Sequence, residues 1–445
     1  MSKTVAKYQK YAEYKDSGVE WLGEIPSHWG IEYSKWLFEE RNTKATAQDE
    51  MLTASQKYGV IPQKMFMELE QQKVVQVLSG HDILKKAEAN DFVISMRSFQ
   101  GGIEFSEYSG AVSSAYVPLK PRKDLSLLYY KYLFKSAPYI QALQTTTNLV
   151  RDGQALRYGN FIQVRIPLVS FNEAENIGQF LDHETAKIDT LIAKQEKLIE
   201  LLKEKRQAVI SHAVTKGLNP DVTMKDSGVE WLGQVPEHWT VKSYRHASKI
   251  YRGKFGHRPR NDPAFYDGEY PFIQTGDVAR AGKYITSYSQ TLNEKGKEVS
   301  QLFPKGTLMM AIAANIGDLA ILGFEAYAPD SVVGFKPNQD IDLEFLRYSF
   351  MAALPALEQT STQSTQANLN VERIGAVQGV FPSLNDQQEI VSYLDDMLNK
   401  YSVIEREMHK AIELLQERRT ALISSAVTGK INVTNWQKPQ EAQAV

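Results

Sequence analysis

The sequence predicts an α/β protein: two mixed α/β domains joined by two long helices packed as an antiparallel coiled coil, with an internal pseudo-twofold repeat. Three observations predict this fold. The sequence DSGVEWLG occurs at residues 16–23 and again at 226–233. Matched segments with a heptad pattern lie at 177–217 and 390–430, and a β-rich stretch separates each repeat element from its heptad segment. A chain that repeats one order of elements from its midpoint is a tandem duplication.

Length and composition bound the class of protein. A chain of 445 residues is too long for one hydrophobic core and predicts two to four domains. The absence of cysteine excludes a disulfide framework and thiolate chemistry. No apolar run approaches the ~20 residues that cross a bilayer, and residues 1–15 lack an apolar signal core, so we expect a soluble cytoplasmic protein. The net charge of −2 argues against a highly basic coat protein but leaves nucleic-acid binding open, because the distribution of charge matters more than its sum.

The repeat element and the heptad segments divide the chain. The repeat continues as EIPSHW at 24–29 and QVPEHW at 234–239, and both heptad segments lack proline, as a long helix requires. We predict, in chain order, an N-terminal tail with the first repeat element (1–29), a middle domain (30–172), a central helix (173–217), a linker with the second element (218–239), a second middle domain (240–385), a C-terminal helix (386–430) and a polar tail (431–445).

Each heptad segment carries a mostly apolar seam with 4-3-4-3 spacing, which indicates a coiled coil. Two such seams in one chain most simply pack on each other. The polar seam members Gln195, Arg206, Glu405 and Arg419 either fix the register or lie at solvated flanks, and both interpretations stay open. The apolar members are Ile188, Ile192, Ile199, Leu202, Val209 and Ala213 in the first helix and Tyr401, Met408, Ile412, Leu415, Leu422 and Ala426 in the second.

Both helices have start and stop signals. Asn172 precedes the first helix and Asn385 the second, and asparagine is a good N-cap. Gly217 and Gly429 follow the last turns, where glycine is the usual C-cap.

The two middle stretches predict domains that contain a sheet. Short apolar runs at 92–96, 110–119, 307–314 and 331–335 are broken by Gly, Pro and Asn, as strands are. Residues 101–121 align weakly with 317–337, and the middles otherwise diverge. A retained frame with divergent middles suggests that each middle binds something different.

Motifs that carry catalysis are missing from the sequence. It holds no P-loop, no dinucleotide fingerprint, no HExxH, no GxSxG and no amino-methyltransferase motif of the NPPY type. The eight histidines do not cluster at ligand spacing. We therefore predict no catalytic residue, no metal site and no cofactor in this chain.

Basic and amide side chains in glycine-flanked turns are the candidate binding residues. The segment 249–260, KIYRGKFGHRPR, has five cations and no acid. Its Tyr251 and Phe255 are interleaved with these cations, and Gly253 is expected to let the backbone come close to a partner. Such a loop suits phosphate contact and groove entry, although it is also what an ordinary solvated loop looks like.

Further turns in both halves carry the side chains that read base edges, chiefly Arg, Gln and Asn. For any single turn the alternative is an ordinary turn or a phosphate contact. The DNA-binding candidates are Ser55, Lys57, Tyr58, Arg97, Ser98, Gln100, Arg151 and Arg157 in the first half and Lys254, Arg258, Arg260, Gln274 and Asn315 in the second.

Taken together, these features resemble the specificity (S) subunit of a type I restriction–modification system. The resemblance covers about residues 15–430 and rests on the twice-used DSGVEWLGxxPxHW element, two variable middles and two matched helices. Local matches add to it. They are YPFIQTGDV (270–278), ANIGDLAI (314–321), APDSVVGF (328–335), STQANLNVERI (364–374) and FPSLNDQQEIVSYLD (381–395). The turn RSFQ at 97–100 departs from the Asn-Ile-Gly of the second half, so base contacts cannot be copied between the halves.

The resemblance implies that the two middles are target recognition domains, each reading one half of a bipartite, asymmetric DNA site, with the helices setting the spacer. It also implies two methyltransferase (M) subunits and restriction/translocase (R) subunits as partners, which would hold S-adenosylmethionine, ATP and Mg. Two other functions stay open. One is a coiled-coil scaffold that binds protein, which shares the helix evidence but does not need these turns. The other is an enzyme with an unrecognised site, such as a nuclease.

Overall fold

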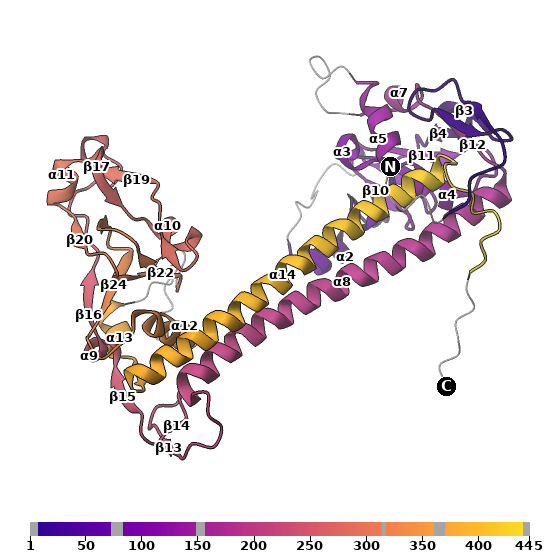
Figure 1. Cartoon of the computed structure of the whole chain (residues 1–445). Helices are drawn as coiled ribbons and strands as arrows, with labels where there is room; N and C mark the ends of the chain where they lie inside the picture. The colour runs from indigo at the N-terminus through magenta and orange to yellow at the C-terminus, as the bar shows by residue number, and fades with distance from the viewer. Residues whose placement is uncertain (1–7, 73–82, 148–155, 314–316, 360–369, 439–445) are drawn as a thin grey trace. The chain divides into compact units, whose positions relative to one another are not determined.

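A computed structural model describes residues 8–72, 83–147, 156–313, 317–359 and 370–438 (Figure 1). The chain forms two compact units, one of residues 1–195 with 409–445 and one of residues 196–408. Each unit holds one sheet-containing domain and a part of each long helix. The predicted class, two mixed α/β domains with two long helices, is confirmed.

The two long helices are α8 (Phe171–Lys216) and α14 (Leu384–Val427). They pack antiparallel within each unit, since Asp189 meets Arg419 in the first unit and Arg206 meets Ser402 in the second. Every predicted seam position is buried or half-buried, whereas the α8 residues between them at 193–194, 196–198 and 203–205 are exposed. The 4-3-4-3 pattern thus corresponds to the face along which the helices meet.

The expected asparagine caps are wrong, because Asn172 and Asn385 lie inside their helices. Serine takes the capping position instead. The Ser383 hydroxyl accepts the Asp386 amide at 3.2 Å, and the Ser170 carbonyl accepts an amide of the first turn of α8. Serine caps a helix as well as asparagine does. Because a serine and an asparagine lie two residues apart at each helix start, the sequence leaves the first residue of the helix ambiguous. The helix ends follow the prediction, with Gly217 (φ +79°) and Gly429 (φ +71°) in the left-handed conformation.

The sheets of the two units share a common order. A central antiparallel run β4-β11-β8-β9 in the first unit matches β16-β24-β21-β22 in the second, where β18 adds a parallel edge to β22. The strands β8, β21 and β22 are buried along their whole length, which explains their continuous apolar sequences. These strands are β4 (Phe38–Glu40), β11 (Val117–Pro121), β8 (Phe92–Ile94), β9 (Glu104–Phe105), β16 (Ser248–Arg252), β24 (Val332–Pro337), β21 (Leu308–Ala311), β22 (Leu319–Leu322) and β18 (Tyr284–Ile285).

Smaller sheets complete each domain. The pairs β3–β12 and β15–β25 bring the two ends of each middle stretch together, and the repeat elements form the hairpins β1–β2 and β13–β14. The remaining strands are β1 (Tyr14–Asp16), β2 (Glu24–Pro26), β3 (Gly30–Tyr33), β5 (Leu52–Ser55), β6 (Gly59–Pro62), β7 (Lys85–Ala87), β10 (Gly110–Val112), β12 (Arg165–Leu168), β13 (Met224–Asp226), β14 (Gln234–Pro236), β15 (Thr240–Ser243), β17 (Tyr266–Phe272), β19 (Gln290–Leu292), β20 (Gln301–Phe303), β23 (Ala326–Ala328) and β25 (Gln378–Phe381).

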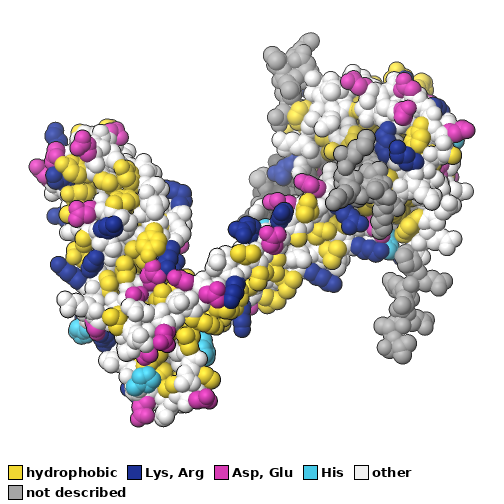
Figure 2. Space-filling model, viewed as in Figure 1, with side chains coloured by type: hydrophobic (Ala, Val, Ile, Leu, Met, Phe, Trp, Pro, Cys, Tyr) yellow, Lys and Arg dark blue, Asp and Glu magenta, His cyan; other side chains and the backbone are white. Residues whose placement is uncertain are grey.

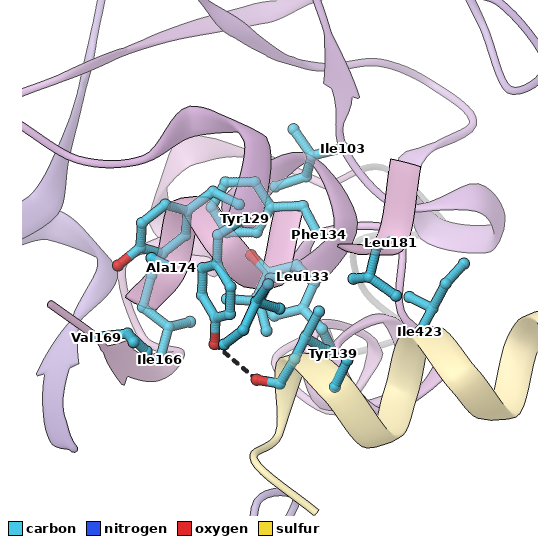
Figure 3. Packing of buried hydrophobic residues seen from close by; sticks show 14 of the residues in the cluster. Ile103, Tyr129, Leu133, Phe134, Tyr139, Ile166, Val169, Ala174, Leu181 and Ile423 are labelled. Atoms are coloured by element: carbon cyan, nitrogen blue, oxygen red, sulfur yellow. Dashed lines mark hydrogen bonds between the residues drawn. The ribbon is translucent and has the colours of Figure 1, made fainter. Parts of the chain in front are cut away.

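Short helices cover the sheets and join them to the long helices. In the first unit, Tyr129 of α4 belongs to the same buried cluster as Leu181 of α8 and Ile423 of α14, and its hydroxyl donates to the Val427 carbonyl at 2.6 Å (Figure 3). The core of this domain is therefore continuous with the helix pair. The shorter helices are α1 (Ser34–Leu37), α2 (Gln63–Glu70), α3 (Ser98–Gly101), α4 (Leu127–Leu133), α5 (Ala137–Gln144), α7 (Tyr158–Phe161), α9 (Tyr244–Ala247), η3 (Pro263–Phe265), α10 (Thr275–Arg280), α11 (Glu294–Glu298), α12 (Leu343–Gln359) and α13 (Val371–Ala376).

Candidate nucleic-acid interface

The two repeat elements fold as the same hairpin. In both, an aspartate side chain accepts the amide of the glycine two residues on, Asp16 from Gly18 at 2.9 Å and Asp226 from Gly228 at 3.0 Å. The indole of the tryptophan in each element donates to a backbone carbonyl of its own domain, that of Trp231 to Gln378 at 3.0 Å. The aspartate and tryptophan side chains that the two repeat elements share therefore stabilise local structure.

Each hairpin is anchored on the C-terminal end of a long helix. The Lys430 ammonium donates to the Leu22 carbonyl at 3.2 Å, and the Lys216 ammonium donates to the Leu232 carbonyl at 3.0 Å. Burial lowers the pKa of both lysines, which are held by neutral carbonyls. The repeat elements therefore seat a sheet domain on each helix end.

In the first unit, two candidate turns lie side by side. The Ser55 hydroxyl accepts the Tyr58 amide at 3.4 Å and so shapes the β5–β6 turn. The Gln56 amide group in that turn reaches the Arg97 carbonyl at 3.5 Å. The Lys57 side chain is 71% exposed. This arrangement brings the Ser55–Tyr58 turn and the Arg97 turn to one surface.

The side chains of the Arg97 turn have different roles. Arg97 and Gln100 are exposed, as a base-reading pair must be. Ser98 is fully buried, and its hydroxyl accepts the Ser95 amide at 2.8 Å. Ser98 therefore holds the turn and does not reach a ligand. The prediction missed this because a serine that closes a turn looks the same in sequence as one that faces outward.

The third candidate segment of the first unit is only partly described. Arg157 is exposed at the start of α7, where its amide donates to the Asn160 side chain at 3.0 Å. Arg151 lies outside the described residues, as does Asn315 in the second unit.

In the second unit, the basic loop exposes its cations and buries one of its two aromatic side chains. Lys254 is exposed, and both Arg258 and Arg260 bond the Asp330 carboxylate, which neutralises part of their charge. Phe255 is 3% exposed and packs with Tyr266, so its predicted place at the partner surface is wrong. The loop thus offers an arginine pair held in place by an acid.

Gly253 serves the protein's own packing. A Cβ there would lie 1.9 Å from the Pro329 carbonyl oxygen, so the residue must be glycine for the β16 end to pass its neighbour. The segment that comes close to the Gly253 backbone is therefore part of this chain, around Pro329, and not a partner as expected.

Gln274 begins α10 and is half-buried. Its amide donates to Asp277 at 2.8 Å, and its side chain donates to Gln290 Oε1 at 2.8 Å. The side chain also takes part in a capping box with Asp277, so its orientation is set by the start of α10 and by Gln290.

Sequence reasoning missed a charged cluster that joins the second domain to α14. The Lys283 ammonium donates to Asp395 Oδ2 at 2.8 Å and also bonds Glu344, and the Tyr348 hydroxyl donates to Asp395 Oδ1 at 2.5 Å. Burial opposes the charge on Lys283, yet the two carboxylates raise its pKa overall. Asp395 occupies the position in the second heptad segment that Asp182 occupies in the first, and this repetition is the signal in the sequence that could have pointed to the cluster.

Among the described residues, no group of three or more acids and histidines is placed to hold a metal ion. Among those same residues, no helix has the length and apolar composition that a membrane span needs.

Known proteins similar to this chain share one description. Residues 236–414 match the family model "Type I restriction modification DNA specificity domain". The MjaIX specificity subunit of Methanocaldococcus jannaschii is 27% identical over 38% of this chain and 40% of its own length. The chain thus spans two fifths of that relative. The StySPI specificity subunit of Salmonella potsdam is 21% identical over 82% of this chain and 78% of its own length.

The fold has a counterpart among solved structures. A chain from a type I R-M system, solved for its complex assembly and conformational transition, matches with a TM-score of 0.66 at 13% identity, over 91% of this chain and 98% of the other. At this identity the likeness is one of fold. The family model and the relatives carry the same description, so residues 236–414 are similar to the DNA specificity domain of type I restriction–modification systems, and the chain as a whole is similar to their specificity subunits.

Proposed function

We propose that this chain is the non-catalytic DNA-reading subunit of a type I restriction–modification complex, and that each domain reads one half of a bipartite, asymmetric site. One observation carries the proposal: the same frame presents two different polar surfaces. The first unit offers Gln56, Arg97 and Gln100 on adjacent turns. The second offers Lys254 and the Arg258–Arg260 pair. Different donor patterns read different base edges.

The long helices serve as the spacer and the assembly surface. Large apolar side chains are exposed along them, including Leu191, Leu198, Leu201 and Leu414 (Figure 2). An exposed apolar stripe on a helix pair suits further helices from a partner. We assign this surface to two M subunits, with R subunits joining for cleavage. S-adenosylmethionine, ATP and Mg belong to those partners in this proposal.

An exchange of one domain tests the function directly. Residues 240–385 are replaced by the matching domain of another specificity subunit, and the variant is expressed with its M subunits. Mapping of N6-methyladenine across the host genome should show one half-site changed and the other intact, because each domain reads alone. A change in both half-sites would contradict the modular proposal.

The wild-type complex supplies the control. Its binding to random duplex DNA should weaken steeply as salt rises, because phosphate contacts release counterions. No affinity for DNA at low salt would favour a protein-binding scaffold. Metal-dependent cutting by the purified chain alone would favour a nuclease.

A further inference from the structure

The two units contain one matched pair of side chains that is completed in different ways. The Tyr132 hydroxyl donates to Asp182 Oδ1 at 2.6 Å in the first unit, as that of Tyr348 does to Asp395 Oδ1 in the second. In the second unit, Lys283 bonds the other oxygen of its aspartate. Among the described residues, no lysine or arginine forms an ion pair with Asp182.

A cavity of about 530 Å³ lies beside Asp182 within the first unit. The β5–β6 turn, α4, α8 and α14 all contribute to its walls. This turn is the counterpart of the Lys283 segment. Val60 of β6 forms a parallel bridge with Ser106, directly after β9, just as β18 pairs in parallel with β22, and β9 and β22 hold the same place in the two sheets. Here, however, Lys57 bonds Glu70 at 3.3 Å. The place of the Lys283 ammonium is therefore not taken by the corresponding turn.

The cavity also holds an unsatisfied acceptor. The Glu104 side chain is 2% exposed, and its Oε1 accepts the Lys135 ammonium at 2.6 Å. Its Oε2 is buried and has no hydrogen-bond partner among the described atoms. Lys135 cannot supply a further proton, because it also donates to the Gly101 carbonyl at 3.0 Å and the Gln56 carbonyl at 3.4 Å. A buried carboxylate oxygen without a donor is unfavourable and indicates that a donor belongs there.

The cations around the cavity are already neutralised. Each has an acid within ion-pair distance, so an anion entering the cavity would gain little. These pairs are Lys57–Glu70, Lys131–Glu107, Lys135–Glu104 and Arg419–Asp189. Of the carboxylates that line the cavity, Asp182 has no cationic partner among the described residues and Glu104 has one oxygen without a donor.

We propose that this cavity binds a primary alkylammonium group, which takes the position in the first unit that Lys283 holds in the second. The ammonium would bond Asp182 or Glu104 Oε2, and the alkyl chain would lie against Val60, Ile61 and Ile423 of the cavity wall. The volume lies within the roughly 300–1,000 Å³ of small-ligand sites. The ammonium comes either from a lysine of a partner polypeptide or from a free aliphatic amine. The proposal does not depend on DNA reading.

Calorimetric titration of the full chain with cadaverine and spermidine tests this site. We expect saturable one-site binding, weakened about tenfold or more by Asp182→Asn and by Glu104→Gln, because each removes a charged acceptor. Asp182 is exposed, so its variant tests the site even if Glu104→Gln misfolds. The matched control is Asp395→Asn, whose position is already filled by Lys283, and it should leave amine affinity unchanged.

A second titration, on the complex with its M subunits, separates the two sources. Loss of amine binding on assembly assigns the cavity to a partner lysine, and retained binding assigns it to a free amine. The proposal is overturned if the wild-type chain shows no saturable amine binding. It is equally overturned if Asp182→Asn binds as tightly as wild type.

Discussion

The two units are built on one frame, yet they join their sheet domains to the helices differently. Both use the same hairpin, the same helix-end lysine and the same tyrosine–aspartate bond. The second unit adds Lys283, which ties the β18 segment to α12 and α14, whereas the first leaves a cavity in that place. The difference teaches that the frame tolerates divergence at the domain–helix contact as well as in the reading turns.

The largest expected effect distinguishes the two helix ends. Gly429 and Gly217 both have positive φ, but a Cβ on Gly429 would lie 2.4 Å from Pro26 Cδ, against 3.1 Å from Trp239 for Gly217. We expect Gly429→Ala to destabilise the first unit by about 2–4 kcal/mol, since strain and overlap add. Gly217→Ala should cost the second unit about 1 kcal/mol from the backbone alone. Hydrogen exchange, followed separately in the two hairpins, measures both. Equal losses would show that the two ends are equivalent.

The next effect concerns Lys283, the residue that sets the units apart. Lys283→Met removes the cation between two carboxylates, so we expect the second unit to lose about 2 kcal/mol of stability. Lys57→Met in the matching turn of the first unit is the control. Its side chain is 71% exposed and solvent screens its ion pair with Glu70, so we expect no measurable loss of stability. Chemical denaturation of the two variants supplies the comparison.

The same cluster gives the second unit a pH dependence. Burial by itself would raise the pKa of Asp395, but the bonds from Lys283 and Tyr348 outweigh it and lower this pKa below its ordinary value. A lowered carboxyl pKa contributes stability above the unfolded value of about 3.9, and this contribution is lost as the pH falls through the folded value. In Lys283→Met this acid-side contribution should shrink. An unchanged acid limb would mean that Lys283 does not hold Asp395 in its charged form.

The fold was predictable because the duplication and the heptad spacing can both be read directly from the sequence. Phe255 shows where such reasoning ends. Its neighbours in sequence are cations and glycines, and its inward orientation shows only in the fold, where it packs with Phe265, Tyr266 and Phe272. Ser98 was misassigned for the same reason, because its bond with the Ser95 amide exists only once the turn has folded. Lys283 was missed because its partner Asp395 lies far along the chain and no short-range pattern joins them.

The smallest effect concerns the polar members of the seam. Arg206 bonds the Ser402 hydroxyl at 2.6 Å, whereas Arg419 bonds the Asp189 carboxylate at 2.9 Å. These are matched positions of the repeat, so Ser402→Asp would give the second unit the pair of the first. Because these side chains are partly exposed, we expect a gain of only about 0.2–1 kcal/mol, reduced by salt.

A double-mutant cycle on Ser402→Asp and Arg206→Gln isolates the coupling between the two side chains. If these arginines fix the register of the helices, Arg206→Gln with Arg419→Gln should also alter the spacing between methylated half-sites. If they only cover a solvated flank, stability falls slightly and the spacing stays. The two interpretations that the sequence leaves open are thereby separated by a measurement of distance on DNA, which is independent of the small energies involved.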